Sequence, residues 1–167
     1  MLKKNENYRS ELSAPTLTVD GSLLGNTLIR AAYRGKINQM KHLLRDGADP
    51  SGRDCHGWTP LHWAASKGHN EAIACLIEND ADVNATDHLN GWSPLHLAAI
   101  NNERLVAEIL LKAGASYTTK DKFGDVPKDC VRKDRKRLLN TLDMDADKMS
   151  ESSEYTENSS SDSYDSF

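Results

Sequence analysis

The chain contains nearly the same nine-residue stretch twice, and this duplication constrains the fold more than any other feature. Residues 57–65 read GWTPLHWAA, and residues 91–99, thirty-four positions later, read GWSPLHLAA. Seven of the nine positions are identical, and Thr59 and Ser93 are both small hydroxyl residues. Two such copies indicate a repeat protein, in which neighbouring units stack to bury faces that one unit cannot bury alone.

Each copy carries the signals of a helix start. Thr59 suits the position before a helix, and Pro60 suits the first turn, where a missing N–H group costs nothing. Ser93 and Pro94 repeat this arrangement in the second copy. An amphipathic segment at 71–77 follows Gly68 and predicts a second helix. The repeating unit is therefore expected to be helix, tight turn, helix and loop.

The T-P-L-H-x-A core, recurring at about 33 residues, resembles the ankyrin-repeat family. This resemblance implies an all-α solenoid of helix-turn-helix-loop repeats, whose loops project sideways to the next repeat. We expect an ankyrin-repeat domain over 23–142, with repeats at about 25–54, 57–87 and 91–121 and a degenerate capping repeat at 124–142. Terminal repeats are atypical because one of their faces meets water.

The flanks of this domain differ from it in composition. Residues 1–22 are polar and irregular, and we expect a flexible N-terminal arm. Residues 143–167 hold eight acidic residues, one lysine and eight serines, a formal charge of −7, which predicts a disordered acidic tail. Ser159 precedes Asp162 by three positions and is a candidate phosphorylation site. The basic segment 132–137 is interpreted either as a localisation signal or as a solvated cap.

Composition bounds the location of the protein. The hydrophobic content of 38% is low for a compact domain and agrees with unfolded flanks. The three cysteines, Cys55, Cys75 and Cys130, show no close-spaced pairing pattern, which favours a reduced, intracellular protein. No apolar run is long enough to cross a membrane, and none follows the N-terminal lysines. We expect a cytoplasmic or nuclear protein without a membrane partner.

The sequence offers no catalytic constellation. His62 and His96 recur once per full repeat, and the family resemblance implies that they organise the loop and the helix start. Cys55, His56 and His69 lack the paired spacing of a zinc site. A phosphate-binding glycine loop and a nucleophile elbow are both absent from the sequence. We therefore expect no enzyme activity, no cofactor, no metal site and no small-molecule substrate.

Two tryptophans are candidate binding residues. Trp58 and Trp92 occupy the same position of successive repeats, just before a helix. The family resemblance places this position on the variable, partner-facing side, and tryptophan is enriched in binding hot spots. We expect an exposed row of two indoles; the alternative is that each ring covers its own turn. Trp63 stands where the family usually has leucine and is expected to face the core.

The family resemblance also places other residues at partner contacts, on the loop tips and along the inner helices. These expected contacts are Tyr33, Arg34, Cys55, His56, Ser66, Lys67, His88, Asn90, Ile100, Asn101, Lys122 and Phe123. Together they mix aromatic, amide and charged groups. Such a mixture suits a protein partner better than a small-molecule pocket.

The functional expectation follows from the resemblance, because a fold alone does not fix a function. We expect a non-enzymatic protein-protein interaction module. Short ankyrin proteins of this size resemble cell-cycle and kinase regulators, such as the cyclin-dependent kinase inhibitors, so a kinase complex or a DNA-replication control protein is the first candidate partner. An adaptor or inhibitor of a transcription factor is the alternative, although such ankyrin proteins usually carry more repeats. Nucleic acid is not favoured, because the basic segment lacks interleaved aromatic residues.

Overall fold

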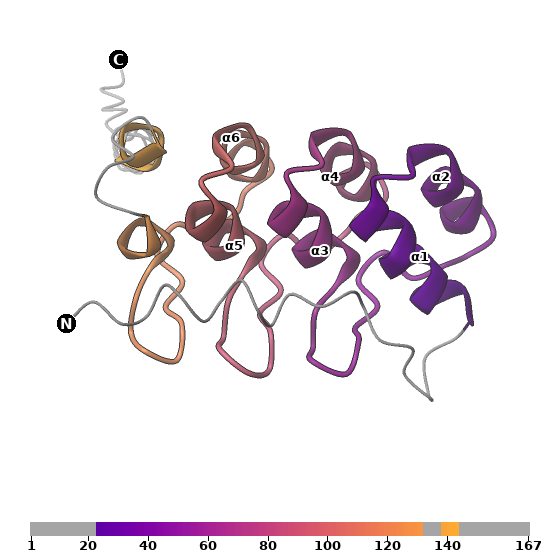
Figure 1. Ribbon diagram of the computed structural model, residues 1–167, viewed down its shortest axis with the longest axis horizontal. Helices are drawn as coiled ribbons and strands as arrows, with labels where there is room; N and C mark the ends of the chain where they lie inside the picture. The colour runs from indigo at the N-terminus through magenta and orange to yellow at the C-terminus, as the bar shows by residue number, and fades with distance from the viewer. Residues whose placement is uncertain (1–22, 132–137, 144–167) are drawn as a thin grey trace, which may run out of the picture.

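The computed structural model describes residues 23–131 and 138–143, and these form a stack of helix pairs (Figure 1). The pairs are α1 (Leu23–Arg34) with α2 (Ile37–Arg45), α3 (Pro60–Lys67) with α4 (Asn70–Ile77), and α5 (Pro94–Asn101) with α6 (Arg104–Lys112). A short 3₁₀ helix, η1 (Pro127–Cys130), and a helical turn over 138–143 follow. Helices are the only regular elements in these residues, which confirms the all-α repeat architecture.

Three predictions concern segments outside the described residues. The flexible arm was predicted over residues 1–22, and the basic segment lies at 132–137. The disordered acidic tail was predicted over 143–167, of which only Asp143 is described. These predictions therefore stay predictions.

The helices form two rows (Figure 1). The inner row contains α1, α3 and α5, and the outer row contains α2, α4 and α6. Within the inner row α1 packs against α3, α3 against α5, and α5 against η1, while α4 contacts both of its outer neighbours. Loops project from the side of the inner row that faces away from the outer helices.

A capping box begins the inner helices α3 and α5. The side-chain oxygen of Thr59 accepts a hydrogen bond from the His62 amide, and the His62 ring accepts one from the Thr59 amide. Ser93 and His96 form the same reciprocal pair at α5. Each box satisfies amide donors that a helix start leaves without an intrahelical acceptor. The predicted capping role of Thr59 and Ser93 is confirmed.

The same two helices end on a left-handed residue. Gly68 takes a φ of 71° after α3, and Asn102 takes a φ of 61° after α5. Asparagine tolerates this conformation better than most residues that carry a Cβ atom. The change from Gly-His to Asn102-Glu103 therefore leaves the helix-turn-helix geometry of the third repeat intact.

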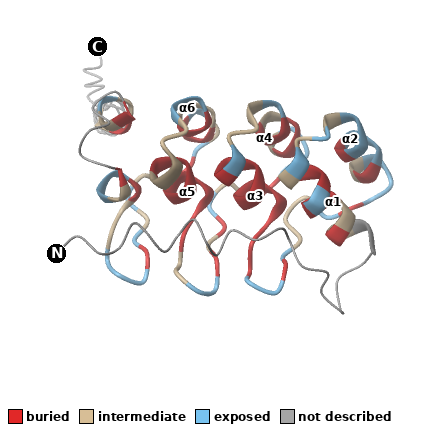
Figure 2. Cartoon of the chain, in the orientation of Figure 1, coloured by how far each residue is buried: buried red, intermediate tan, exposed pale blue. Residues whose placement is uncertain are grey.

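The core runs continuously through the stack (Figure 2). Leu28, Leu61 and Leu95 occupy equivalent positions of successive repeats, and all three are 0% exposed. Small residues such as Ala64 and Ala98 let neighbouring inner helices approach closely. The repeat register inferred from the sequence is thereby confirmed from α1 to α5.

The C-terminal end of the stack is closed by the last described turn. Leu138 and Leu142 are buried against the core together with Val131, and Leu139 is half-buried. Lys128 of η1 and Asp143 form an ion pair that joins the two pieces of this cap.

Candidate functional site

Three loops, here called fingers, form the side of the molecule that the outer helices do not cover. They comprise residues 54–58, 87–92 and 121–125. Each finger closes on itself through a backbone bond of 2.9 Å, from the amide of its first residue to the carbonyl of its last. The second finger is one residue longer than the others. The extra residue lies between the two hydrogen-bonded ends of the loop, so the closing bond is kept.

Backbone bonds also join neighbouring fingers. The His88 amide donates to the His56 carbonyl at 3.2 Å, and the Lys122 amide donates to the Asn90 carbonyl at 2.8 Å. The three fingers therefore form one connected row rather than three independent loops.

Each finger begins with a buried aspartate that organises it: Asp54, Asp87 and Asp121. One carboxylate oxygen of each residue accepts two amide hydrogen bonds from its own finger, at distances of 2.8–3.0 Å. A buried carboxylate is tolerated only when it is hydrogen-bonded in this way. These aspartates recur at spacings of 33 and 34 residues, a signal that was present in the sequence but was not recognised.

The second oxygen of each carboxylate accepts an indole N–H group. Trp58 donates to Asp87 at 3.0 Å, and Trp92 donates to Asp121 at 3.2 Å, so each tryptophan bonds to the finger of the next repeat. The Trp63 indole donates to Asp54 at 2.9 Å. We call the bonds from Trp58 to Asp87 and from Trp92 to Asp121 the tryptophan-aspartate ladder.

The predicted exposed row of tryptophans is wrong. Trp58 is 6% exposed and Trp92 is 5% exposed. The physical reason is the ladder, because a buried carboxylate in the next repeat satisfies the polar end of each ring. Neither ring simply covers its own turn, since each joins two repeats. Trp63 faces the core as predicted, and its ring centroid lies 4.5 Å from that of Trp58.

The recurring histidines have the structural role that was predicted. Beyond its capping box, His62 donates from Nε2 to the Trp92 carbonyl at 3.0 Å, and His96 donates to the Asp125 carbonyl at 3.3 Å. Burial lowers the pKa of His62 from 6.5 to about 4, and burial also lowers the pKa of His96. A neutral ring fits this geometry, because Nδ1 accepts a hydrogen bond while Nε2 donates one.

The remaining predicted contact residues divide by exposure. The exposed ones are Arg34, Cys55, His56, Lys67, His88, Lys122 and Phe123. The half-buried ones are Tyr33, Asn90, Ile100 and Asn101. Ser66 is buried, and its hydroxyl donates to the Trp63 carbonyl of its own helix at 2.9 Å, so its predicted partner contact is wrong.

Two bulky apolar side chains protrude at the tips of adjacent fingers. Leu89 in the second finger is 59% exposed, and Phe123 in the third is 54% exposed. Phe123 was among the predicted contacts, whereas Leu89 was missed. The signal for Leu89 was the one-residue insertion in its finger, which places an apolar residue in a loop of otherwise polar character.

The inner-helix ends add an aromatic and cationic cluster. Tyr33 packs edge-on against Trp63, with ring centroids 5.5 Å apart. The ammonium group of Lys67 lies 4.8 Å from the centre of the Tyr33 ring. This distance permits a cation-π interaction, which holds the Lys67 charge at the surface of the inner row.

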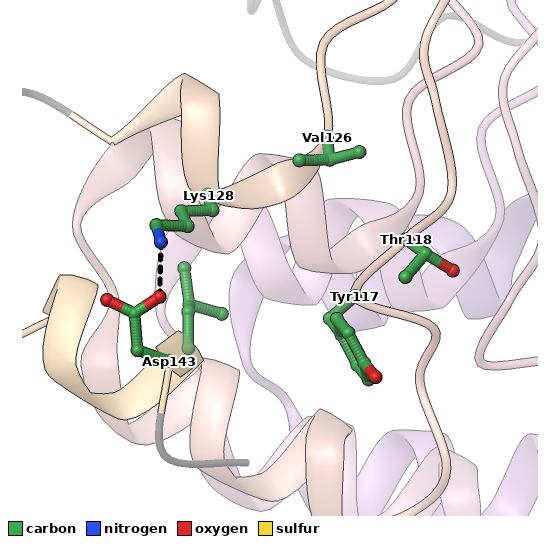
Figure 3. A pocket seen from close by; sticks show the side chains of 6 residues that line it. Tyr117, Thr118, Val126, Lys128 and Asp143 are labelled. Atoms are coloured by element: carbon green, nitrogen blue, oxygen red, sulfur yellow. Dashed lines mark ion pairs between the residues drawn. The ribbon is translucent and has the colours of Figure 1, made fainter. Parts of the chain in front are cut away.

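A cysteine–histidine pair and a hollow near the cap bear on metal and small-molecule binding. Cys55 and His56 lie 3.2 Å apart between Sγ and Nδ1, but no cluster of three or more metal-ligating side chains occurs among residues 23–131 and 138–143. A hollow of about 220 Å³ lies beside the cap (Figure 3). It is lined by Tyr117, Thr118, Val126, Lys128, Leu142 and Asp143. The Lys128–Asp143 ion pair spans one side of it, so its main charges compensate each other.

Comparison with known proteins identifies the family. Residues 28–121 match the family model described as ankyrin repeats (3 copies). The chain belongs to the ankyrin-repeat family. Ankyrin repeats are protein-protein interaction modules and are generally non-catalytic.

Individual relatives share only part of their length with this chain. It is 38% identical over 58 residues to human ankyrin repeat domain-containing protein 39, and the matched segment covers 35% of this chain and 32% of the relative. It is 39% identical over 49 residues to the Medicago truncatula protein VAPYRIN-LIKE, and this segment covers 29% of this chain and 11% of the relative. It is 41% identical over 63 residues to the potassium channel KOR2 of Oryza sativa subsp. japonica, covering 38% and 9%. The matched segments thus span a third or less of these relatives.

Among residues 23–131 and 138–143, none of the helices has both the length and the apolar character needed to cross a bilayer.

Proposed function

We propose that the chain is a non-enzymatic module that docks on a protein partner through the tips of its fingers. The observation that carries this proposal is the exposure of two bulky apolar side chains, Leu89 and Phe123, on neighbouring fingers. The fingertip surface is defined here by His56, His88, Leu89, Asn90, Lys122 and Phe123. Apolar anchors surrounded by polar groups are typical of interface hot spots.

The rigidity of the fingers supports this proposal. Their aspartates hold the loops from inside, the tryptophan-aspartate ladder ties the second and third fingers to the preceding repeat, and backbone bonds connect the tips. A surface that is already ordered loses little conformational entropy when it binds, so more of the contact energy appears as affinity.

The inner-helix ends would extend the same surface. Arg34 and Lys67 are exposed there, and Tyr33, Ile100 and Asn101 are half-buried. Trp58, Trp92 and Ser66 are excluded from direct contact by their burial. The interface proposed from the sequence therefore loses these three residues and keeps the fingertips and the ends of α1, α3 and α5.

The partner class is a finer part of the proposal. A regulatory role toward a protein kinase, in cell-cycle or DNA-replication control in the cytoplasm or nucleus, is favoured by the small number of repeats. A transcription-factor adaptor or inhibitor is the alternative. None of the three relatives described above is named as a kinase or a transcription factor. The identity of the bound protein therefore has to decide between these two partner classes.

The test is a capture experiment with the full chain immobilised and with a matched pair of variants. Leu89→Ala combined with Phe123→Ala removes both fingertip anchors. Leu105→Ala is the control, because Leu105 is also 59% exposed but lies on α6 in the outer row. Captured proteins are identified by mass spectrometry.

The expected result is a protein retained by the wild-type chain and by the Leu105 variant, but lost from the fingertip variant. A kinase in this set favours the first partner class, and a transcription factor favours the second. Equal retention by all three chains would contradict the fingertip surface as the docking site.

A further inference from the structure

The fingers and the residues just before them carry fully exposed charges of one sign. The residue before the first finger is Arg53, the residue before the third is Lys120, and Lys122 lies within the third; all three are exposed. The three aspartates that begin the fingers are buried, and each accepts three N–H hydrogen bonds. Asp125 is half-buried. The charges that an incoming molecule meets at full exposure are therefore cationic.

The cations continue along the inner row. Arg30 and Arg34 of α1 and Lys67 of α3 are exposed, whereas α5 contributes the neutral residues Ile100 and Asn101. Apart from Asp129 in η1, the exposed carboxylates of the described residues lie on the outer helices and the turns after them, where exposed lysines and arginines accompany them. The carboxylates are Asp46, Asp49, Glu71, Glu78, Asp80 and Asp82, and the cations are Lys41, Arg45, Arg104 and Lys112. An acidic molecule would thus be attracted to the fingers, α1 and α3 more than to the outer row, where both signs of charge occur.

Two of these cations are held in position. Arg53 donates from Nη1 to the Gly57 carbonyl at 2.9 Å and to the Thr86 carbonyl at 2.7 Å, which joins the first finger to the residue before the second. The Lys122 ammonium donates to the His88 carbonyl and bridges the second and third. Carbonyl partners orient these groups without cancelling their charge. An anion would therefore meet cations that are already ordered.

Apolar anchors lie in the same row as these cations. Leu89 and Phe123 occupy fingers that are joined by the bond from the Lys122 amide to the Asn90 carbonyl. A purely polyanionic ligand would leave both side chains in water. The combination instead fits a chain segment that carries carboxylates together with bulky apolar side chains.

We propose that the fingertip surface binds an acidic segment of the partner protein that also carries bulky apolar residues. This inference rests on the proposed docking function and specifies the chemistry of the partner. The acidic tail of this chain, with its formal charge of −7, has related composition and is the alternative occupant that the test must separate.

The probe is a short synthetic peptide of alternating glutamate and leucine or phenylalanine, labelled for fluorescence anisotropy. Matched peptides carry glutamine or lysine in place of glutamate. The full chain is compared with a variant that combines Lys67→Glu and Lys122→Glu, with its milder counterpart Lys67→Gln and Lys122→Gln, and with the control Lys112→Glu. Lys112 is exposed in the last turn of α6, in the outer row. A thermal melt of each variant checks folding.

The acidic peptide is expected to bind more tightly than the glutamine peptide, with affinity that falls as salt rises. Charge reversal at Lys67 and Lys122 should weaken it by about tenfold or more, neutralisation should weaken it less, and Lys112→Glu should leave it within about twofold. Equal binding of the glutamate and glutamine peptides, or no effect of charge reversal in a folded variant, would overturn the inference.

A further variant separates the tail from an external partner. It replaces the seven acidic residues of 144–167 with their amides. If this variant binds the acidic peptide about tenfold more tightly than the wild-type chain does, the tail occupies the surface and the partner assignment is wrong. If acidic peptides do not bind, but a partner protein is still captured by the wild-type chain and lost from the Leu89 and Phe123 variant, the inference fails and the proposed docking function stands.

Discussion

The bases and the tips of the fingers use large apolar residues for different purposes. At the base, Trp58 and Trp92 are buried and bonded to carboxylates of the next repeat. At the tip, Leu89 and Phe123 are exposed beside basic groups. Only a few residues along the chain separate the two environments. The contrast shows that a large apolar residue in a finger becomes part of the fold or part of the surface according to whether the neighbouring repeat offers a place for it.

The contrast also separates stability from binding. Residues of the base join repeats that cannot fold alone, so their loss should weaken the whole stack. Leu89 and Phe123 at the tips expose more than half of their surface, so their truncation should cost the fold little.

Removal of a base tryptophan should have the largest effect. Trp58→Ala is expected to cost about 3–5 kcal/mol of unfolding free energy, the range typical for a buried tryptophan. It also deprives the buried Asp87 carboxylate of an N–H donor. Urea unfolding followed by circular dichroism measures the change, with Phe123→Ala as the fingertip control. A loss below about 1 kcal/mol would show that the base does not stabilise the stack.

The ladder bond can be tested without creating a cavity. In the wild-type chain the two carboxylate oxygens of Asp87 accept three N–H groups. Asp87→Asn keeps the shape of the side chain but replaces one of these oxygens with an NH₂ group. One donor would then face another donor, and we expect a loss of about 1–3 kcal/mol. Asn90→Ala is the matched control within the same finger, because Asn90 is half-buried and joins the Asp87 carboxylate only through its backbone amide, which alanine keeps. Equal stability of the two variants in urea would contradict the role of the carboxylate.

The pH dependence of stability tests the buried histidine. The folded pKa of His62, about 4, lies below its ordinary value of 6.5. The unfolded chain therefore binds a proton at His62 first as the pH falls, so stability is retained above pH 6.5 and is lost between about 6.5 and 4. The loss should be on the order of 3 kcal/mol, from about 1.4 kcal/mol per pKa unit.

The control for this prediction is His62→Gln, which lacks the titrating ring. Its stability should be lower at neutral pH but should fall less steeply between pH 6.5 and 4 than that of the wild-type chain. Parallel pH profiles for the two chains would mean that His62 is not the group responsible.

Much of the fold could be predicted from the sequence because the determining signals are local and repeated. The capping residues Thr59 and Ser93, the prolines that follow them and the register of Leu28, Leu61 and Leu95 all lie within short segments. A helix start depends on a few neighbouring residues, so its prediction needs no knowledge of the partner helix.

The candidate site could be predicted only in part, because exposure depends on contacts between repeats. The sequence placed Trp58 and Trp92 in the fingers correctly, but their burial depends on Asp87 and Asp121, each 29 positions further along the chain. Leu89 was missed for the converse reason: an apolar residue is expected to be buried, and only the geometry of the longer second finger shows that it protrudes.

In the proposed function, the fingertips bind the partner while the finger bases maintain the fold. Isothermal titration of the captured partner into the combined Leu89→Ala and Phe123→Ala variant separates these two roles, with Leu105→Ala as the control. We expect the binding free energy to fall by about 2 kcal/mol or more, roughly thirtyfold in affinity, while the unfolding free energies of the two variants agree within about 0.5 kcal/mol. Unchanged affinity in the folded fingertip variant would mean that the partner binds elsewhere.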